Sequence, residues 1–382
     1  MTTSLTAPPG LKGLIVADTA LGDVRGQEGF YHYRQYPAPA LAAERRFEDA
    51  WYLLWEGALP TPDQQAAFDA ELRAARRLPP AVLDALPAVA AGAPLTALRT
   101  ALSVAGAALG LRPIYDLDEP GRRADALAVA ALTPGLIAAT HRLRHGLAPV
   151  PPRDDLGHAA HYLYQLTGEV PAPEPARAVE TYLTATLEHG FNASAFTARI
   201  VASTGADVAS CVLAALGALS GPRHGGAPSR ALDSLDAIGT PDRTAAWVRE
   251  RVLAGDRIMG FGHAVYRTTD PRNTLLRQVA RDLAGSPAAA GPDPKGLVAF
   301  AEQVEQQVEE TLAELKPGRE LHANVEFYAG VVMELAGLPR ELFTPTFACS
   351  RVVGWCAHVL EQARDPRIIR PSARYVGPEP LV

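Results

Sequence analysis

The chain has little cysteine and no large excess of charge of one sign. Its 382 residues carry 36 basic and 42 acidic side chains, for a net charge of −6. That balance argues against a nucleic-acid-binding protein, which usually has a basic face, although a local arginine cluster would still suit an anionic substrate. The three cysteines, Cys211, Cys349 and Cys356, have neither metal-site nor disulfide spacing, which fits packing in a reducing cytoplasm.

The sequence also lacks the long apolar runs of a membrane protein. Its start, MTTSLTAPPGLKG, has no basic segment followed by an apolar one, so we expect no signal peptide. The most apolar stretch, 127–139, contains Pro134 and is shorter than the ~18 apolar residues of a spanning helix. We therefore expect a soluble, cytoplasmic protein.

Apolar residues at helical spacing are what the chain has in abundance. They make up 48% of the sequence, which is enough for a large core. Their recurrence at intervals of three and four predicts amphipathic helices within 47–54, 179–187, 208–219 and 300–315. Strand signals are few, and we expect small hairpins only in the glycine-containing opening segment 10–34. The predicted fold class is nearly all-α.

Proline and glycine interrupt the helical pattern at several places. A chain of this length usually forms more than one compact unit, so we expect two domains. The segment 285–296, GSPAAAGPDPKG, has the composition of a mobile surface loop. The interruptions fall near 149–153, 169–175, 221–228, 285–296 and 371–380.

Two histidine pairs have the spacing of metal ligands on one helix face. His141 and His145 are four residues apart, and His158 and His161 are three apart. Neither pair has a nearby cysteine or acidic residue in a recognisable arrangement, and two arginines between the first pair would repel a cation. We therefore interpret both pairs as solvated helix faces and expect no metal site.

Two other histidines lie in glycine-containing loops. His224 stands in SGPRHGGAPS, directly after the predicted helix 208–219, and His263 stands in RIMGFGHAVYRTTDPR. Glycine allows positive φ and lets the backbone approach a ligand closely. A histidine in one such loop is weak evidence, but the two together predict two imidazoles that face a cleft.

Arginines and one glutamate complete the candidate site. A guanidinium matches a carboxylate with two parallel hydrogen bonds, so two or three arginines would suit a dicarboxylate, although each alone is more often a surface ion-pair partner. We expect Asn324 to cap a helix whose first turn contains Glu326, either as structural support or as a general base. The arginines are Arg267, Arg272, Arg351, which we place at the start of a helix, and Arg370.

Several motifs in series resemble those of the citrate synthase family over almost the whole chain. One alone would be a modest signal, but the complete ordered series is specific. In chain order they are GLKGLIVADTALGDVRGQEGFYHYR, FEDAWYLLWEGALPT, EHGFNASAFTARIVAST, GALSGPRHGGAP, DRIMGFGHAVYRTTDPR, NVEFYAG, FTPTFACSRVVGWCAHVLEQ and IIRPSARYVGP.

The resemblance implies an almost all-helical fold with a cleft between two domains. The large domain would comprise 1–224 and 336–382, and the small domain 225–335. It also implies a homodimer in which each active site receives an arginine, here Arg370, from the other subunit. The implied reaction condenses acetyl-CoA with oxaloacetate and then hydrolyses the thioester to give citrate and CoA, with no metal or cofactor.

The resemblance also implies a role for each candidate residue. His224 would stabilise the enol of acetyl-CoA, His263 would bind the oxaloacetate ketone and supply a proton, and Glu326 would be the base. Further oxaloacetate ligands would be His189, Arg272, Arg351 and Arg370. The CoA site would contain Ile258, Met259, Gly260, Phe261, Gly262 and Arg267.

Two positions depart from the family pattern. The family has an aspartate where this chain has Glu326, which adds one methylene, roughly 1.5 Å of reach. Either the backbone accommodates the longer base, which we favour, or the protein is a slow or specialised relative. Pro228 also replaces a frequent asparagine and would stiffen the loop that holds His224.

Three alternative functions stay open from the sequence. A 2-methylcitrate synthase using propionyl-CoA shares nearly all these motifs, and one substrate methylene is worth only ~1–3 kcal/mol of discrimination. A lyase that cleaves citryl-CoA would use the same residues in reverse. A low-activity or non-catalytic paralogue that binds CoA or oxaloacetate is the third, and Glu326 is the feature that favours it.

Overall fold

The computed structural model describes residues 6–221, 224 and 228–380, and sixteen α-helices dominate this part of the chain. The first eight are α1 (Ala38–Glu44), α2 (Phe47–Glu56), α3 (Pro62–Ala75), α4 (Pro80–Val89), α5 (Pro94–Ala108), α6 (Glu119–Arg144), α7 (His158–Thr167) and α8 (Pro173–Ala185). The others are α9 (Ala193–Ala202), α10 (Val208–Leu219), α11 (Pro228–Ile238), α12 (Thr244–Leu253), α13 (Pro271–Ala284), α14 (Pro294–Leu315), α15 (Val325–Leu335) and α16 (Phe343–Gln362). Short 3-10 helices are η1 (Pro9–Leu11), η2 (Ile114–Asp116), η3 (Pro241–Arg243) and η4 (Arg340–Leu342).

The opening segment forms the small antiparallel sheet that the sequence predicts. Strands β1 (Gly22–Arg25), β2 (Phe30–Tyr33) and β3 (Tyr36–Pro37) pair in chain order. Side chains alternate between the two faces of β2, so Tyr31 and Tyr33 enter the core with 1% and 0% exposure. The nearly all-α prediction is therefore confirmed.

The predicted helices form where their periodic faces and caps place them. The apolar face of α10 is buried, and the Asp207 carboxylate accepts from the amide of Ser210 at 2.9 Å to cap its first turn. Three predicted interruptions prove to contain helix starts, because Pro173, Pro228 and Pro294 occupy the first position of α8, α11 and α14. Proline suits that position since its missing N–H would have no helical partner.

Two helix boundaries differ from the sequence prediction. Pro134 lies inside α6 without ending it, so the apolar stretch 127–139 is part of one continuous helix. By length and composition α6 could cross a membrane, but 78% of its apolar window is buried inside the protein, which is the position of a core helix. Arg351 does not open a helix, because α16 begins eight residues earlier at Phe343.

His158 and His161 are buried, which corrects their interpretation as a solvated face. Both side chains are less than 6% exposed, and the His158 ring stacks on Phe47 with 5.0 Å between centroids. Burial, with a contribution from Arg76, lowers the pKa of both imidazoles to about 3. They are neutral core residues between α2 and α7.

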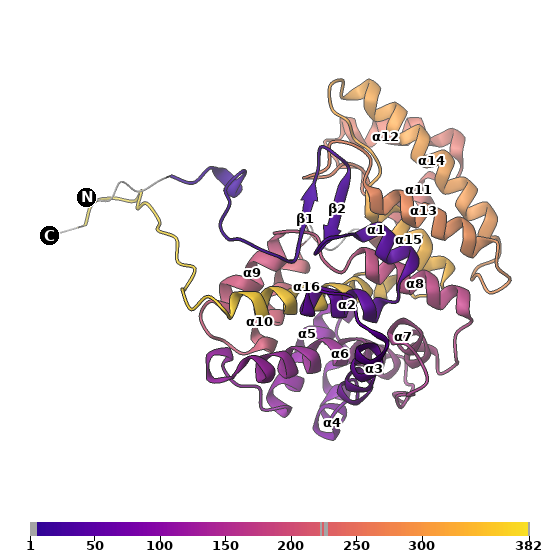
Figure 1. Ribbon diagram of the computed structural model, residues 1–382. Coiled ribbons are helices and arrows are strands. Elements are labelled where there is room, and N and C mark those ends of the chain that lie inside the picture. The colour runs from indigo at the N-terminus through magenta and orange to yellow at the C-terminus, as the bar shows by residue number, and fades with distance from the viewer. Residues whose placement is uncertain (1–5, 222–223, 225–227, 381–382) are drawn as a thin grey trace.

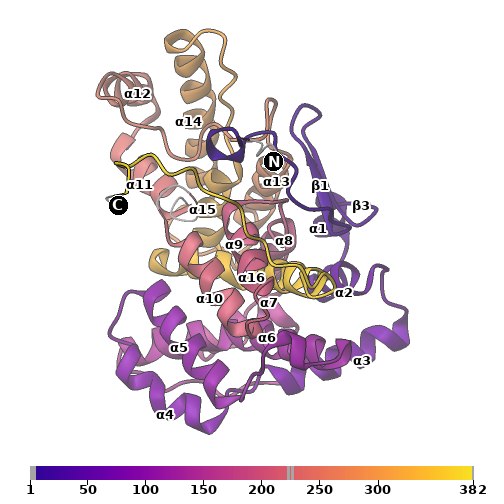
Figure 2. The same cartoon turned by 90° about the vertical axis from the view of Figure 1, so that its left-hand side faces the viewer.

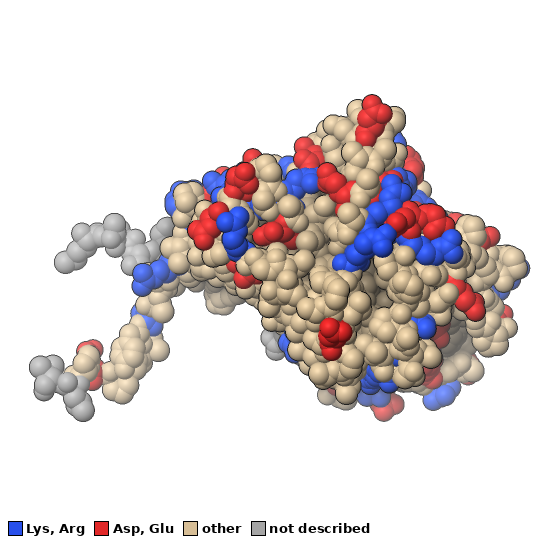
Figure 3. Space-filling view, turned by 90° about the horizontal axis from the view of Figure 1, so that it is seen from below, with Lys and Arg blue, Asp and Glu red and all other residues tan. Residues whose placement is uncertain are grey.

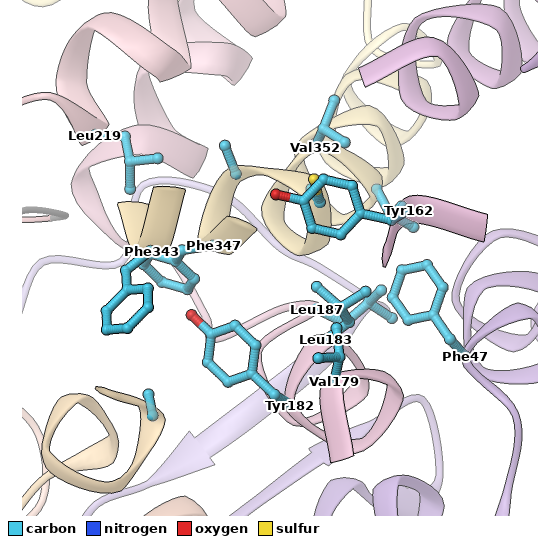
Figure 4. Packing of buried hydrophobic residues seen from close by; sticks show 14 of the residues in the cluster. Phe47, Tyr162, Val179, Tyr182, Leu183, Leu187, Leu219, Phe343, Phe347 and Val352 are labelled. Atoms are coloured by element: carbon cyan, nitrogen blue, oxygen red, sulfur yellow. The ribbon is translucent and has the colours of Figure 1, made fainter. Parts of the chain in front are cut away.

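Helices far apart in the sequence share one core. Helices α11 to α15 gather in the upper part of Figures 1 and 2, and all belong to the predicted small domain. Figure 4 shows packed side chains of α8, α10 and α16, including Tyr182, Leu219 and Phe347. These residues and Leu276 of α13 belong to a single hydrophobic cluster, so the core continues across the predicted domain boundary.

The two terminal segments extend away from this core. They lie side by side on the left of Figure 1 and project from the body in Figure 3. The Arg374 guanidinium joins them by donating to the Thr6 hydroxyl at 3.0 Å. On the face that Figure 3 shows, acidic and basic side chains lie next to one another with broad uncharged areas between them.

Candidate active site

A cavity of about 1780 Å³ contains nearly all the residues that the sequence proposed. Its inner wall comes from the loop after α8, from the starts of α13 and α15, and from α16. Its mouth is formed by segment 257–267 except for His263, by the α14–α15 connection and by residues 14–17 of the N-terminal segment. The predicted residues that line it are His189, His224, Ile258, Met259, Gly260, Phe261, Gly262, His263, Arg267, Arg272, Glu326 and Arg351.

A buried ion pair fixes the first arginine of the inner wall. Asp270 caps α13 by accepting from the amide of Arg272, and it also holds the Arg272 side chain through Nε at 3.0 Å and Nη2 at 2.7 Å. Both residues are at most 2% exposed. Burial disfavours the charge on Asp270, but Arg272 outweighs it and lowers the pKa of the carboxyl. Arg272 is therefore held rigidly with its charge intact.

The tautomer of His263 follows from its backbone contacts. The amides of Val265 and Tyr266 donate to Nδ1 at 3.0 and 3.1 Å, so the neutral ring carries its proton on Nε2. Arg272 Nη2 lies 3.3 Å from that Nε2. Burial and then Arg272 lower the pKa of His263 to about 4. The ring is thus a neutral N–H donor at neutral pH.

His189 lies against His263, with 5.5 Å between the ring centroids. Its Nε2 is 2.9 Å from the Tyr266 hydroxyl. Burial and then Arg272 lower the pKa of His189 well below its ordinary value. Two neutral imidazoles therefore stand side by side at the inner end.

His224 is held by a chain of hydrogen bonds from α9. Its Nε2 lies 2.7 Å from the Ser194 hydroxyl, which also receives the indole N–H of Trp355 at 3.1 Å. The Ser194 hydroxyl has a single proton with two possible acceptors, Asn192 Oδ1 at 2.7 Å and His224 Nε2, and in one arrangement it donates to Nε2. In that arrangement the proton of His224 is on Nδ1. Burial and then Arg351 lower its pKa to about 4.

Glu326, in the first turn of α15, is the least exposed of three carboxylates that line the cavity, since Asp23 and Glu320 are both exposed. The Asn324 side chain accepts from the Glu326 amide at 3.0 Å, which confirms the predicted helix cap. Burial raises the pKa of Glu326 to about 7; Arg272 lowers it in part and Asp270 adds to the rise. A carboxyl group with that pKa is well matched to proton abstraction near neutral pH.

Arg351 is a buried cation that forms no direct ion pair among the described residues, although the buried carboxylate of Glu188 favours its charge from a longer distance. It is 4% exposed, its Nε has no hydrogen-bond partner there, and its guanidinium lies over the Phe347 ring at 4.8 Å. Burial and then Arg272 lower its pKa to about 10, so it stays charged. Buried charges are normally paired, so an anion bound in the cavity would complete this site.

A backbone wall lines the outer half of the cavity. Gly260 and Gly262 have positive φ of 83° and 80°, which glycine adopts without strain. The wall is held by two hydrogen bonds of 2.8 Å, from the Gly262 amide to the His322 carbonyl and from the Asn324 amide to the Gly260 carbonyl. The wall consists of Ile258, Met259, Gly260, Phe261 and Gly262.

Four cationic side chains line the same cavity in addition to Arg272 and Arg351. Arg257 and Arg267 belong to the wall and the loop after it, and Lys316 and Arg319 belong to the α14–α15 connection. The three arginines of this group are exposed, and the Arg267 guanidinium donates to two backbone carbonyls of its own loop, each at 3.4 Å. The outer half therefore offers positive charge around an open backbone surface.

Arg370 is the predicted ligand that the structure does not bring to the cavity. It lies in the exposed, extended segment after α16 and is absent from the residues that line the cavity of its own chain. Its contribution to the site of a second subunit stays a prediction.

Sequence reasoning missed the residues that hold the catalytic candidates. Ser194 and Asp270 lie within the family motifs, two residues from Asn192 and Arg272 respectively. The sequence alone does not show that the Ser194 hydroxyl contacts His224. Nothing in the sequence marks Tyr266 as a partner of His189, and their hydrogen bond becomes visible only in the folded chain. The N-terminal residues 14–17 were absent from the predicted site for the same reason.

The cavity defines the chain as an enzyme that acts on anionic small molecules by acid–base chemistry, because neutral imidazoles, a carboxylate and buried arginines converge there. Comparison with known proteins agrees: residues 10–372 match the family model described as citrate synthase, C-terminal domain. The chain belongs to the citrate synthase family and is a transferase of that family.

Relatives with two names resemble the chain equally well. It is 37% identical to a citrate synthase of Deinococcus radiodurans, over 96% of this chain and 95% of the other. It is 36% identical to a 2-methylcitrate synthase of Mycobacterium tuberculosis, over 100% and 95%. Identities of 37% and 36% are too similar to decide the acyl preference.

Solved structures of the family share the fold. A citrate synthase of Pyrobaculum aerophilum superposes with a TM-score of 0.87 at 35% identity, covering 99% of this chain and 95% of the other. One from Thermoplasma acidophilum, a ternary complex with carboxymethyl coenzyme A and oxaloacetate, superposes with a TM-score of 0.89 at 26% identity, covering 98% and 97%. The helical citrate synthase fold is therefore confirmed.

Proposed function

We propose that this protein condenses acetyl-CoA with oxaloacetate and hydrolyses the resulting thioester to citrate and CoA. The observation that carries the proposal is Arg351, a buried guanidinium that lines the cavity and whose Nε has no hydrogen-bond partner among the described residues. Together with Arg272 it offers two fixed positive charges at the inner end, as a small dicarboxylate requires. The wall 258–262 and the cations at the mouth suit an extended, phosphorylated thioester.

The proposed reaction begins with proton removal. The Glu326 carboxylate takes a proton from the methyl group of acetyl-CoA, and the Nδ1–H of His224 stabilises the negative charge that develops on the thioester oxygen. The methyl carbon then attacks the ketone carbon of oxaloacetate. The Nε2–H of His263 donates to the ketone oxygen as it becomes a hydroxyl. Water cleaves the thioester, releasing CoA and citrate.

The environment of Glu326 supports activity despite its extra methylene. The capping contact of Asn324 fixes the first turn of α15, and the raised pKa of about 7 makes the carboxylate a stronger base than an exposed one. Every other position of the proposed mechanism is occupied by a suitable group inside the cavity. No metal or cofactor takes part in the proposed steps.

Use of propionyl-CoA is the second candidate function, and the similarity to 2-methylcitrate synthases favours it. The decisive experiment measures free thiol released from each acyl-CoA with oxaloacetate, and identifies the products by mass. Release with acetyl-CoA at least about tenfold more efficient than with propionyl-CoA supports the main proposal, since one methylene is worth ~1–3 kcal/mol. A preference for propionyl-CoA would instead support a 2-methylcitrate synthase. No thiol release from either acyl-CoA would overturn both candidate functions.

We also propose that the protein is a cytoplasmic homodimer with a large domain of 1–224 and 336–382 and a small domain of 225–335. The extended C-terminal segment supports a dimer, since it leaves the body of its own chain (Figure 1) and contains the exposed Arg370. Mixing Arg370→Ala subunits with His263→Ala subunits tests the shared site. A hybrid dimer would regain activity through one intact site, and an inactive mixture of exchanging subunits would contradict it.

A further inference from the structure

We propose that the chain binds one divalent transition-metal ion through His141, His145 and Glu341, at a surface site separate from the cavity. Within the described ranges, this is the group of three metal-ligating side chains whose ligand atoms all lie within 4.8 Å of one another. None of the three residues lines the cavity. The site is outside the proposed reaction and does not depend on it.

The fold brings the three side chains together from two distant parts of the sequence. His141 and His145 lie one turn apart at the C-terminal end of α6, with 4.4 Å between their ring centroids. Glu341 lies in η4, 200 residues beyond His141, and its Oε1 is 3.2 Å from His141 Nδ1. This is the acidic third ligand that the sequence around the histidines lacks.

The ring of His145 is already held in the form that binds a metal. Its Nδ1 lies 2.9 Å from the His141 carbonyl, and a carbonyl can only accept, so Nδ1 carries the proton. The lone pair of Nε2 is then free for a cation. Metal-bound histidines commonly donate their other N–H to a carbonyl or carboxylate in this way.

The neighbouring arginines do not block the site. Arg142 is directed elsewhere, because it donates to the carbonyls of Ala148 at 2.6 Å and Leu166 at 3.0 Å. Arg144 lies 3.7 Å from Oε2 of Glu341 and also donates to the Gly92 carbonyl. Arg144 therefore lies near Oε2 of Glu341 and leaves Oε1 facing His141. The positive charge of Arg144 nevertheless weakens the binding of a cation.

Two imidazoles and one carboxylate select the class of ion. Such a set suits Zn²⁺, Co²⁺ or Ni²⁺ rather than Mg²⁺ or Ca²⁺, which prefer oxygen ligands throughout. Three protein ligands leave a fourth position for water. A bound ion would fasten the end of α6 to η4, which leads directly into α16 and thus into the helix that carries Arg351.

The test is Co²⁺ and Zn²⁺ binding to the untagged, full-length protein after treatment with a chelator. Visible absorption reports Co²⁺ coordination, and equilibrium dialysis gives the Zn²⁺ stoichiometry. We expect one ion per chain and an affinity at least about tenfold weaker in His145→Ala and in Glu341→Gln. The matched control is His322→Ala, which removes the histidine of an isolated His322–Glu309 pair at 3.2 Å and should leave binding unchanged.

Two outcomes would overturn the proposal. One is that the wild-type protein takes up no Zn²⁺ or Co²⁺, or that His145→Ala and Glu341→Gln bind as it does. The other is that His263→Ala abolishes uptake while His145→Ala does not, which would move the ion to the histidines of the cavity. Both His145 and Glu341 are exposed, and thermal unfolding of the metal-free variants checks that they remain folded.

Discussion

The two ends of the cavity are built in different ways. At the inner end, Arg272 and Arg351 are at most 4% exposed, and hydrogen bonds from the fold fix the ion pair of Arg272 and the tautomer of His263. At the outer end, a glycine-containing backbone wall and exposed cations face an open mouth. The inner end is therefore organised before any substrate arrives, whereas the outer end offers surface and charge.

This difference explains how one cavity would serve two dissimilar substrates. A small dianion needs fixed, desolvated charges, because their interaction is strong only when water is excluded. A long thioester with phosphate groups needs an extended binding surface with positive charge more than it needs rigidly fixed side chains. Substitutions at the inner end should consequently cost far more than substitutions at the mouth.

Among the residues proposed to bind substrate, the largest effect should come from Arg351→Gln. Losing one member of a buried charge pair costs about 2–5 kcal/mol, so kcat/KM for oxaloacetate should fall roughly 10²-fold or more. Steady-state kinetics with varied oxaloacetate measures it. As a control, Arg249→Gln removes an exposed arginine of α12 that pairs with Glu314 and should change kcat/KM by less than about twofold. Equal effects of the two substitutions would mean that Arg351 matters no more than a surface arginine outside the cavity, and would contradict its proposed role.

The next effect is the pH dependence of kcat/KM, which we expect to follow the ionisation of Glu326 at the inner end. Glu326 is active as a carboxylate, and its pKa of about 7 means that protonation removes the base as the pH falls. We expect kcat/KM to fall about tenfold per pH unit below 7. His224 and His263, with pKa values of about 4, stay neutral over that range. A flat profile from pH 5 to about 8 would contradict this assignment.

A smaller effect is expected from Gly260→Ala in the backbone wall. Positive φ costs an alanine roughly 1–2 kcal/mol, and its Cβ would meet the Phe327 side chain at 3.3 Å. We expect KM for acetyl-CoA to rise about tenfold, with little change for oxaloacetate. Gly255→Ala is the matched control, because φ is 84° there but no atom lies within 4 Å of the added Cβ. Kinetics with each substrate varied separates the two substitutions.

The smallest effect should be that of Arg267→Gln at the mouth. An exposed arginine contributes at most ~1 kcal/mol, so KM for acetyl-CoA should rise only a few-fold, and less at high salt. Measurement at two salt concentrations checks this expectation. A large, salt-independent loss would mean that the mouth is as firmly organised as the inner end.

The sequence predicted which residues enter the site better than it predicted what holds them. Loops with glycine identified His224 and His263, and the helix cap at Asn324 located Glu326. The partners Ser194 and Tyr266 come from other elements and become visible only when the chain is folded. The same holds for Glu341, which lies far from His141 in the sequence.

Periodicity predicted the helices themselves but not all their limits. A proline was expected to interrupt the apolar stretch of α6, yet tertiary packing on every side keeps the helix continuous through Pro134. Histidine spacing alone did not distinguish the buried pair of α7 from the exposed pair of α6. Burial depends on what packs against a helix, and a local pattern does not contain that information.

The central claim is that Glu326 is the base of the inner end. The most direct measurement is the rate of thiol release from acetyl-CoA and oxaloacetate by Glu326→Gln, beside the affinity of the same variant for oxaloacetate. The account predicts a fall in kcat of about 10²–10⁴-fold with oxaloacetate affinity nearly unchanged. A variant that keeps its kcat would contradict the account, because proton removal would then belong to another group.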